Sequence, residues 1–165
     1  MNTFRLSRSS STNTTLLDPD GVISYTISTP LRLGPSQTTI RRGDSVVVIA
    51  SIKWGWLNSK STITMHGQTT LVGEWFPRSN MLSTSRIYTN ASGEKIKWRG
   101  TQVLSCMGED TGLHLVTYDR VPYHPFRRWQ SSLNISSNGM AMLDELVVTW
   151  VIAEKKARDR RRAGR

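Results

Sequence analysis

The C-terminal segment constrains the fold of this chain more than any other part of it. Residues 143–165 read LDELVVTWVIAEKKARDRRRAGR, so an apolar run passes directly into a basic one. From Met140 to Ala153, eleven of fourteen residues are apolar, and they cover every side of a helical wheel. A helix that is apolar all round must be buried, either in a protein or in a bilayer.

The pattern predicts one helix over 139–160, with Asn138 as its N-cap. Asp144 and Glu145 fall near the positive end of its dipole, and the basic residues near the negative end. A membrane-spanning helix needs about 20 apolar residues. This run is shorter and contains two carboxylates, so we expect a core helix and no transmembrane span. A final strand through VVTWVI is the alternative, because those residues have high β-propensity.

The rest of the chain has the short apolar runs and turn residues typical of an all-β protein. Turns are expected at sequences such as DPDG and NASGE. The twelve predicted strands are Phe4–Ser7, Thr14–Leu17, Val22–Ser28, Thr38–Arg41, Val46–Trp54, Ser61–Met65, Thr70–Phe76, Ser85–Thr89, Lys95–Trp98, Gln102–Met107, Leu113–Asp119 and Ser131–Ile135.

These elements predict a mainly β fold, in which a single antiparallel β-barrel of about twelve strands surrounds the C-terminal hydrophobic helix. The whole chain, 1–165, is expected to be one domain. Barrel strands occupy 4–135, the central helix 139–160 and a basic tail 155–165. Closure of the barrel would leave no sheet edge to pair with other chains.

The formal net charge of +10 is unevenly distributed. Residues 154–165 contain seven basic and two acidic side chains, so this segment alone contributes +5. Such a tail can contact anionic lipid, nucleic acid or only water. The candidate anion-binding residues are Lys155, Lys156, Arg158, Arg160, Arg161 and Arg162 in the tail, with Arg127 and Arg128 in a loop. A candidate aromatic patch beside these two loop arginines comprises Trp56, Phe126 and Trp129.

No catalytic or metal-binding pattern is present in the sequence. Cys106 is the only cysteine, which excludes an intrachain disulfide, and we expect it to be a buried, inert thiol. His66, His114 and His124 show no metal-ligand spacing. We therefore expect no catalytic residues, no cofactor and no metal. The N-terminal residues lack an apolar signal region, which favours a cytoplasmic protein and leaves a membrane-peripheral or nuclear location open.

Several blocks occur in a characteristic order, and together they carry a family resemblance. They are NTTLLDPDGVISYTISTP at 13–30, TTIRR at 38–42, IASIKW at 49–54, SRIYTNASGEKIKW at 85–98 and LDELVVTWVIAEKKARDRRR at 143–162. The chain resembles an uncharacterised domain family of mushroom-forming basidiomycete fungi. That family is in turn similar to the tubby C-terminal and LURP-one-related group, which implies a twelve-stranded barrel around a central helix. The resemblance assigns no functional residue.

The leading functional hypothesis is a non-enzymatic binding module, peripheral on an anionic, phosphoinositide-bearing membrane. Two alternatives remain open. The basic C-terminus could serve a nucleic-acid-associated protein or an adaptor for a protein partner, of which nucleic acid is the weaker reading. An enzyme would require Cys106, His124 or the acidic pair of GEDTG to converge in one pocket.

Overall fold

The computed structural model describes residues 1–56, 59–122, 126 and 130–165. These residues form one twelve-stranded antiparallel sheet and one long C-terminal helix, as the sequence predicts. The strands are β1 Asn2–Leu6, β2 Thr14–Leu17, β3 Ile23–Ser28, β4 Gln37–Arg42, β5 Val48–Lys53, β6 Thr62–Met65, β7 Gln68–Leu71, β8 Arg86–Thr89, β9 Lys95–Arg99, β10 Leu104–Gly108, β11 His114–Asp119 and β12 Ser132–Ile135. The helices are α1 Val72–Trp75, the 3₁₀ helix η1 Ser137–Met142 and α2 Leu143–Ala163.

The sheet is open, so the prediction of a closed barrel is wrong. Its order is β7-β6-β5-β4-β3-β2-β1-β12-β11-β10-β9-β8, which leaves β7 and β8 as the two edges. Both edge strands have only four residues, and the connection between them contains α1. Part of that connection pairs with β8 through a β-bridge between Arg78 and Arg86, in the place where β7 would have to pair to close the barrel. The expectation that no sheet edge remains is wrong for the same reason.

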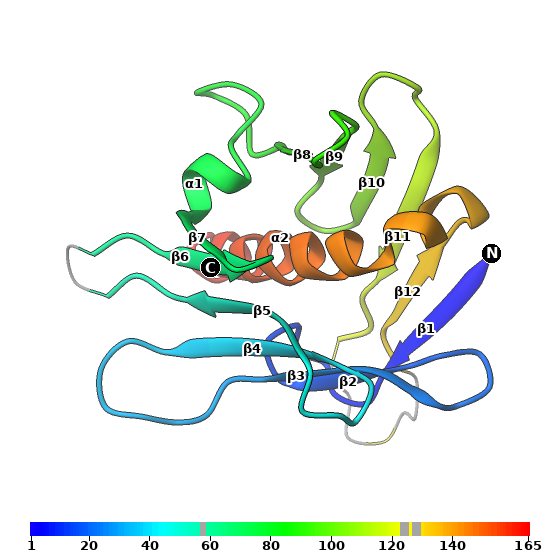
Figure 1. Ribbon diagram of the computed structural model, residues 1–165, viewed down its shortest axis with the longest axis horizontal. Helices are drawn as coiled ribbons and strands as arrows, with labels where there is room; N and C mark the ends of the chain where they lie inside the picture. The colour runs from blue at the N-terminus through cyan, green and yellow to red at the C-terminus, as the bar shows by residue number, and fades with distance from the viewer. Residues whose placement is uncertain (57–58, 123–125, 127–129) are drawn as a thin grey trace.

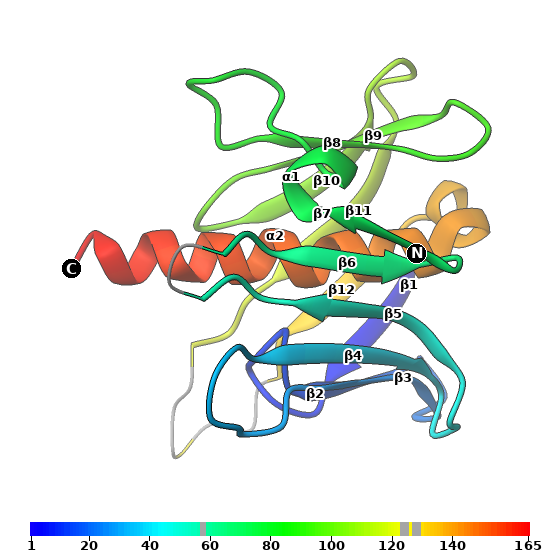
Figure 2. The same ribbon diagram turned by 60° about the vertical axis from the view of Figure 1, so that its left-hand side comes forward.

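The sheet curves around α2, which runs between β8–β10 on one side and β2–β5 on the other (Figure 1, Figure 2). Residues from well-separated parts of the sheet contact this helix. Trp98 Nε1 of β9 donates a 2.8 Å hydrogen bond to Thr149 Oγ1, and the rings of Tyr118 and Trp150 pack edge to face. On the other side, Ser11 Oγ donates to the Val151 carbonyl.

All nine residues from Leu146 to Glu154 are buried, which confirms the predicted core helix. The helix nevertheless begins later than predicted. Residues 137–142 form the 3₁₀ helix, and no side chain caps α2, so Asn138 is not its N-cap. A Cβ at Gly139 would lie 3.0 Å from side-chain atoms of both Ile135 and Leu146, so a larger residue there would have to displace these two side chains.

The segment predicted as a strand over Thr70–Phe76 also changes conformation midway. It is strand to Leu71 and then one helical turn, α1. Val72 and Phe76 lie four residues apart and are both buried, whereas Gly73 and Glu74 between them are exposed. In a strand, positions 72, 74 and 76 share one face, so burying Val72 and Phe76 would bury Glu74 as well. One helical turn places Val72 and Phe76 on the same face and leaves Gly73 and Glu74 exposed.

In the part of the chain that the structure describes, no helix has both the length and the apolar character to cross a membrane.

Candidate functional site: the basic end of the molecule

The antiparallel order divides the connections between strands into two sets, one at each end of the sheet. We call the end at which α2 finishes the basic end; its connections are 7–13, 29–36, 54–61, 72–85, 100–103 and 120–131. We call the opposite end the acidic end; its connections are 18–22, 43–47, 66–67, 90–94, 109–113 and 136–142.

Charge is separated between these two ends. The described residues of the basic-end connections include five basic side chains, Arg8, Arg32, Lys60, Arg78 and Arg120, and one acidic side chain, Glu74. The acidic-end connections contain six acidic side chains and neither lysine nor arginine: Asp18, Asp20, Asp44, Glu94, Glu109 and Asp110. The helix adds to this polarity, because Asp144 and Glu145 begin it and residues 154–165 end it.

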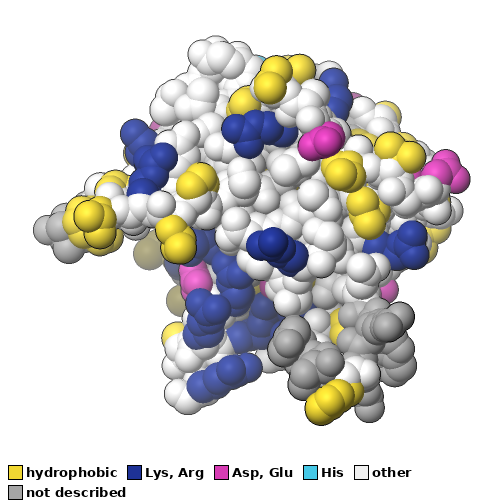
Figure 3. Space-filling model, turned by 90° about the horizontal axis from the view of Figure 1, so that it is seen from below, with side chains coloured by type: hydrophobic (Ala, Val, Ile, Leu, Met, Phe, Trp, Pro, Cys, Tyr) yellow, Lys and Arg dark blue, Asp and Glu magenta, His cyan; other side chains and the backbone are white. Residues whose placement is uncertain are grey.

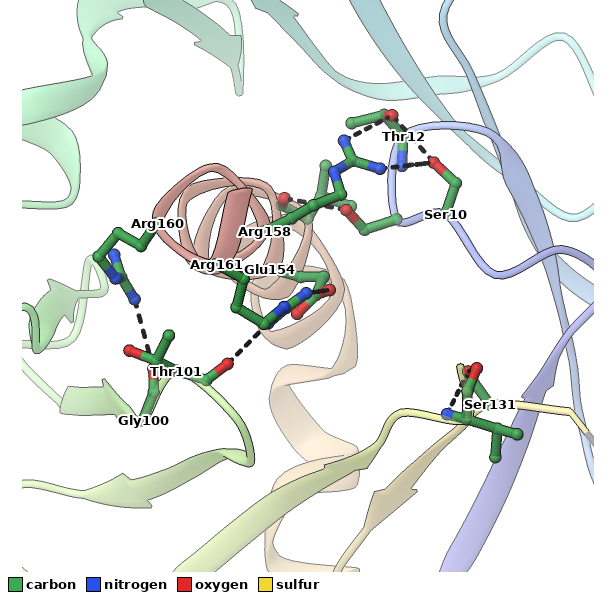
Figure 4. Close-up of polar contacts among 12 residues, drawn as sticks. Ser10, Thr12, Gly100, Thr101, Ser131, Glu154, Arg158, Arg160 and Arg161 are labelled. Atoms are coloured by element: carbon green, nitrogen blue, oxygen red, sulfur yellow. Dashed lines mark hydrogen bonds and ion pairs between the residues drawn. The ribbon is translucent and has the colours of Figure 1, made fainter. Parts of the chain in front are cut away.

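The predicted basic tail is an ordered part of α2, which continues to Ala163. Several of its cations bind loops at the rim of the sheet (Figure 4). Arg158 donates to Ser10 Oγ (3.0 Å) and Thr12 Oγ1 (3.4 Å) in the first connection. On the other side of the helix, Arg160 donates to the Gly100 carbonyl (3.3 Å). These contacts fasten the end of the helix to both sides of the curved sheet.

Arg161 makes two contacts at this end of the helix. Its guanidinium donates to the Thr101 carbonyl (2.6 Å) and to Glu154 Oε1 (2.6 Å), and both side chains of this ion pair are less than 10% exposed. Burial raises the pKa of the Glu154 carboxyl, and the adjacent Arg161 opposes that rise. Within the described structure, Glu154 Oε2 has no hydrogen-bond partner. Arg161 therefore serves the fold and is not a free ligand-binding cation.

Lys155 is also held by neighbours in the protein. Its ammonium lies 2.8 Å from Asp159 Oδ2, one helical turn along, and 4.8 Å from the ring centre of Trp54. Of the predicted tail cations, Lys156 and the exposed Arg162 make no hydrogen bond or ion pair with the described residues.

Lys156 and Arg160 line a pocket of about 280 Å³ together with two arginines that sequence reasoning did not select. Arg78 comes from the connection after α1, and Arg86 begins β8. Arg86 donates to the Phe76 carbonyl (2.7 Å), which fixes its guanidinium at the pocket wall. Neither arginine belongs to a basic run in the sequence, and only the fold brings them to the helix.

Burial is the first cause of a lowered pKa for Lys156, Arg86 and Arg160 alike. Neighbouring cations lower each pKa further: Arg86 and Lys155 act on Lys156, and Arg78 acts on all three. Both causes penalise the charged form, while Asp159 acts in the opposite direction on Lys156 and Arg160. The described lining contains four cations and one carboxylate, so the positive charge is in excess. Figure 3 shows, on one face, a group of Lys and Arg side chains at the lower left, toward the end where α2 finishes.

The predicted aromatic patch is only partly described. Trp56 and Phe126 are both exposed and belong to basic-end connections. Trp129, Arg127, Arg128 and His124 lie outside the described residues. Other apolar side chains at this end are more exposed than Trp56: Leu31, Leu33, Met81 and Leu82 are each at least 92% exposed.

A second pocket, of about 520 Å³, lies at the acidic end beside the start of α2. Asp144 and Glu145 both line it, and the Asp144 carboxylate pairs with Arg42 and accepts a 2.6 Å hydrogen bond from Tyr25 Oη. Burial and the bond to Asp144 raise the pKa of Tyr25 above its ordinary range. Asp144, Arg42 and Tyr25 satisfy one another, so no reactive group is left unpaired among these three.

Of the residues considered for catalysis, the structure describes Cys106, Glu109 and Asp110, and His124 lies outside the described residues. Cys106 is 1% exposed, which confirms the prediction that it is buried, and burial raises the pKa of its thiol. Glu109 and Asp110 lie in an acidic-end turn, away from the basic pocket. Among the described residues, no group of three or more His, Cys, Asp or Glu side chains could hold a metal ion.

Comparison with known proteins gives a family and no activity. Curated proteins provide no match. One solved structure, an X-ray structure of a protein from Arabidopsis thaliana, is 10% identical over 93% of this chain and 90% of that one, with a TM-score of 0.35. Likeness at that level supports no conclusion about fold or function. The model of DUF6593, a family of unknown function, matches residues 9–159. The match covers nearly the whole sheet and helix, and the chain therefore belongs to the DUF6593 family.

Proposed function

We propose that this protein is a non-enzymatic binding module that docks its basic end onto an anionic phospholipid surface. The observation that carries the proposal is the separation of charge between the two ends of the sheet. A polar molecule of this kind is oriented by a negative surface, with its basic end toward the lipid and its acidic end toward water. Each basic residue near an anionic bilayer contributes about 1 kcal/mol to binding.

The exposed apolar side chains of the basic end support the same orientation. Leu31 and Leu33 flank Arg32 in one connection, and Met81 and Leu82 follow Arg78 in another. Alternation of basic and apolar side chains suits the interfacial region of a bilayer, where the cation meets the headgroups and the apolar group meets the acyl boundary. These four side chains are aliphatic and offer no ring on which a base could stack, so a nucleic acid would use them less than a bilayer would.

The test is co-sedimentation with vesicles of phosphatidylcholine alone and of phosphatidylcholine mixed with phosphatidylserine or a phosphoinositide. We expect binding only to the anionic vesicles. The variant pair Arg32→Glu and Lys60→Glu should abolish it at moderate salt, since both exposed residues lie at the basic end.

The matched control is Lys95→Glu, compared with Lys60→Glu alone. Lys95 is exposed and begins β9 directly after the acidic-end connection 90–94, and each single substitution changes the net charge by the same amount. The control should keep most of the binding. Equal loss in Lys60→Glu and Lys95→Glu would show a response to net charge alone. Tight binding of RNA with no binding of anionic vesicles would favour a nucleic-acid role.

A further inference from the structure

We infer that the pocket formed by Arg78, Arg86, Lys156 and Arg160 is a binding site for a phosphate monoester. This inference rests on the proposed function and specifies which headgroup chemistry the basic end would select. The pocket has a volume of about 280 Å³, near the lower end of the range for small-ligand sites.

The bridge and the helix each place a pair of like-charged side chains at this site. Arg78 and Arg86 face one another across an antiparallel bridge. Lys156 and Arg160 are one turn apart on α2. Like charges directly opposite across strands, or four residues apart on a helix, repel one another and destabilise the fold. Both pairs converge on one pocket, so a bound anion would relieve both repulsions together.

The protein itself supplies little negative charge to the pocket. Asp159 is the only carboxylate among its described lining residues, and it already accepts a hydrogen bond from Lys155. The C-terminal end of α2 carries about half a negative charge, too little to balance four cations. The lowered pKa values of Lys156, Arg86 and Arg160 are consistent with this excess.

Donor geometry favours a phosphate monoester over a simple negative surface. Arg86 is fixed by one hydrogen bond to the Phe76 carbonyl, and Arg160 by one to the Gly100 carbonyl. A guanidinium has five N–H donors, so each retains donors for a ligand. Ser83 and Thr84 add hydroxyl groups to the lining. A monoester offers three terminal oxygens and up to two charges, whereas the phosphodiester of a lipid such as phosphatidylserine offers two oxygens and one charge.

The experiment compares vesicles containing phosphatidic acid, a monoester, with vesicles containing phosphatidylserine, a diester, at matched surface potential. We expect the full chain to prefer phosphatidic acid by about tenfold, the contribution of one or two charge-assisted hydrogen bonds. Arg78→Gln with Lys156→Gln should remove the preference. Neither side chain makes a hydrogen bond or ion pair with the described residues, so the substitutions cost the fold little.

The matched control is Arg32→Gln with Lys60→Gln, which removes two charges from the same end outside the pocket. It should weaken binding to both vesicles and keep the preference. Equal binding of both lipids by the full chain would overturn the inference, as would loss of the preference in the control pair.

Calorimetric titration with glycerol 3-phosphate separates a lipid headgroup from a free phosphate. If the full chain binds glycerol 3-phosphate and the Arg78→Gln, Lys156→Gln variant does not, the result supports the pocket. If no vesicle binds in addition, only the membrane proposal is refuted. Absence of binding to glycerol 3-phosphate and to both vesicles would overturn the inference and the proposed function together.

Discussion

Cys106 shows how a single buried group couples this fold to pH. Its thiol sits in β10 facing the core, and burial holds its pKa well above the ordinary value of about 8.5. An unfolded chain ionises this thiol above pH 8.5, while the folded chain keeps it neutral. The unfolded state then binds fewer protons, so stability falls as pH rises from about 8.5 toward the folded pKa.

We therefore expect the free energy of unfolding to fall more steeply with pH in the wild type than in Cys106→Ala. Between pH 9 and 10 the difference in slope should approach about 1.4 kcal/mol per pH unit. Urea unfolding at pH steps, in the presence of a reductant, measures it. Tyr25 and Tyr118 also have raised pKa values. Both tyrosines are present in the wild type and in Cys106→Ala, so their contributions cancel in the difference between the two slopes. Parallel curves from pH 6 to pH 10 would contradict the assignment.

The elements divide into those that local sequence determines and those that depend on distant contacts. Every predicted strand overlaps an observed one, because alternation of buried and exposed residues acts over a few positions. The ends of strands were less predictable. Val46 belongs to an apolar run predicted to be strand, yet it is 90% exposed in a turn, and β5 begins at Val48.

Closure of the sheet and the composition of the basic pocket could not be predicted from local patterns. Whether β7 meets β8 depends on where the 14-residue connection 72–85 lies, and alternation within strands carries no information about that. The tail cations Lys156 and Arg160 were predictable from the basic run. Arg78 and Arg86 are isolated in sequence, and only the bridge between them places both beside α2.

A buried ion pair joins Glu154 to Arg161, two turns further along α2, and Arg161 also donates to the Thr101 carbonyl at the rim of the sheet. Arg161→Met would leave a carboxylate buried without its partner, so we expect a loss of about 3–5 kcal/mol in the free energy of unfolding. Replacing both residues, with Glu154→Met added, should recover most of that loss because no charge then remains buried. Chemical denaturation of the two variants measures the difference.

Arg158→Met is the matched control for this pair. Arg158 lies on the same part of α2 but bonds only the hydroxyls of Ser10 and Thr12. Its loss leaves no buried charge behind and should cost about 1 kcal/mol. If Arg158→Met destabilises as much as Arg161→Met, the buried carboxylate is not the cause.

At the scale of the whole molecule, apolar side chains are exposed at both ends, while charge distinguishes the ends. Leu31 and Leu33 lie at the basic end, and Val22 and Val46 are exposed at the acidic end. Only the basic end can approach an anionic bilayer without repulsion, so only its apolar side chains should enter the interface. The two pairs of residues thus test orientation independently of hydrophobicity.

Leu31→Ser with Leu33→Ser should weaken binding to anionic vesicles by at least about tenfold, because burial of one leucine contributes about 1.5–3 kcal/mol. The effect should persist at high salt, where screening weakens the contribution of the cations. Val22→Ser with Val46→Ser should leave binding unchanged. All four side chains are at least 61% exposed, so neither pair should lower the melting temperature much. Vesicle binding measured across a salt series compares them, and equal effects of the two pairs would mean that the molecule does not dock by its basic end.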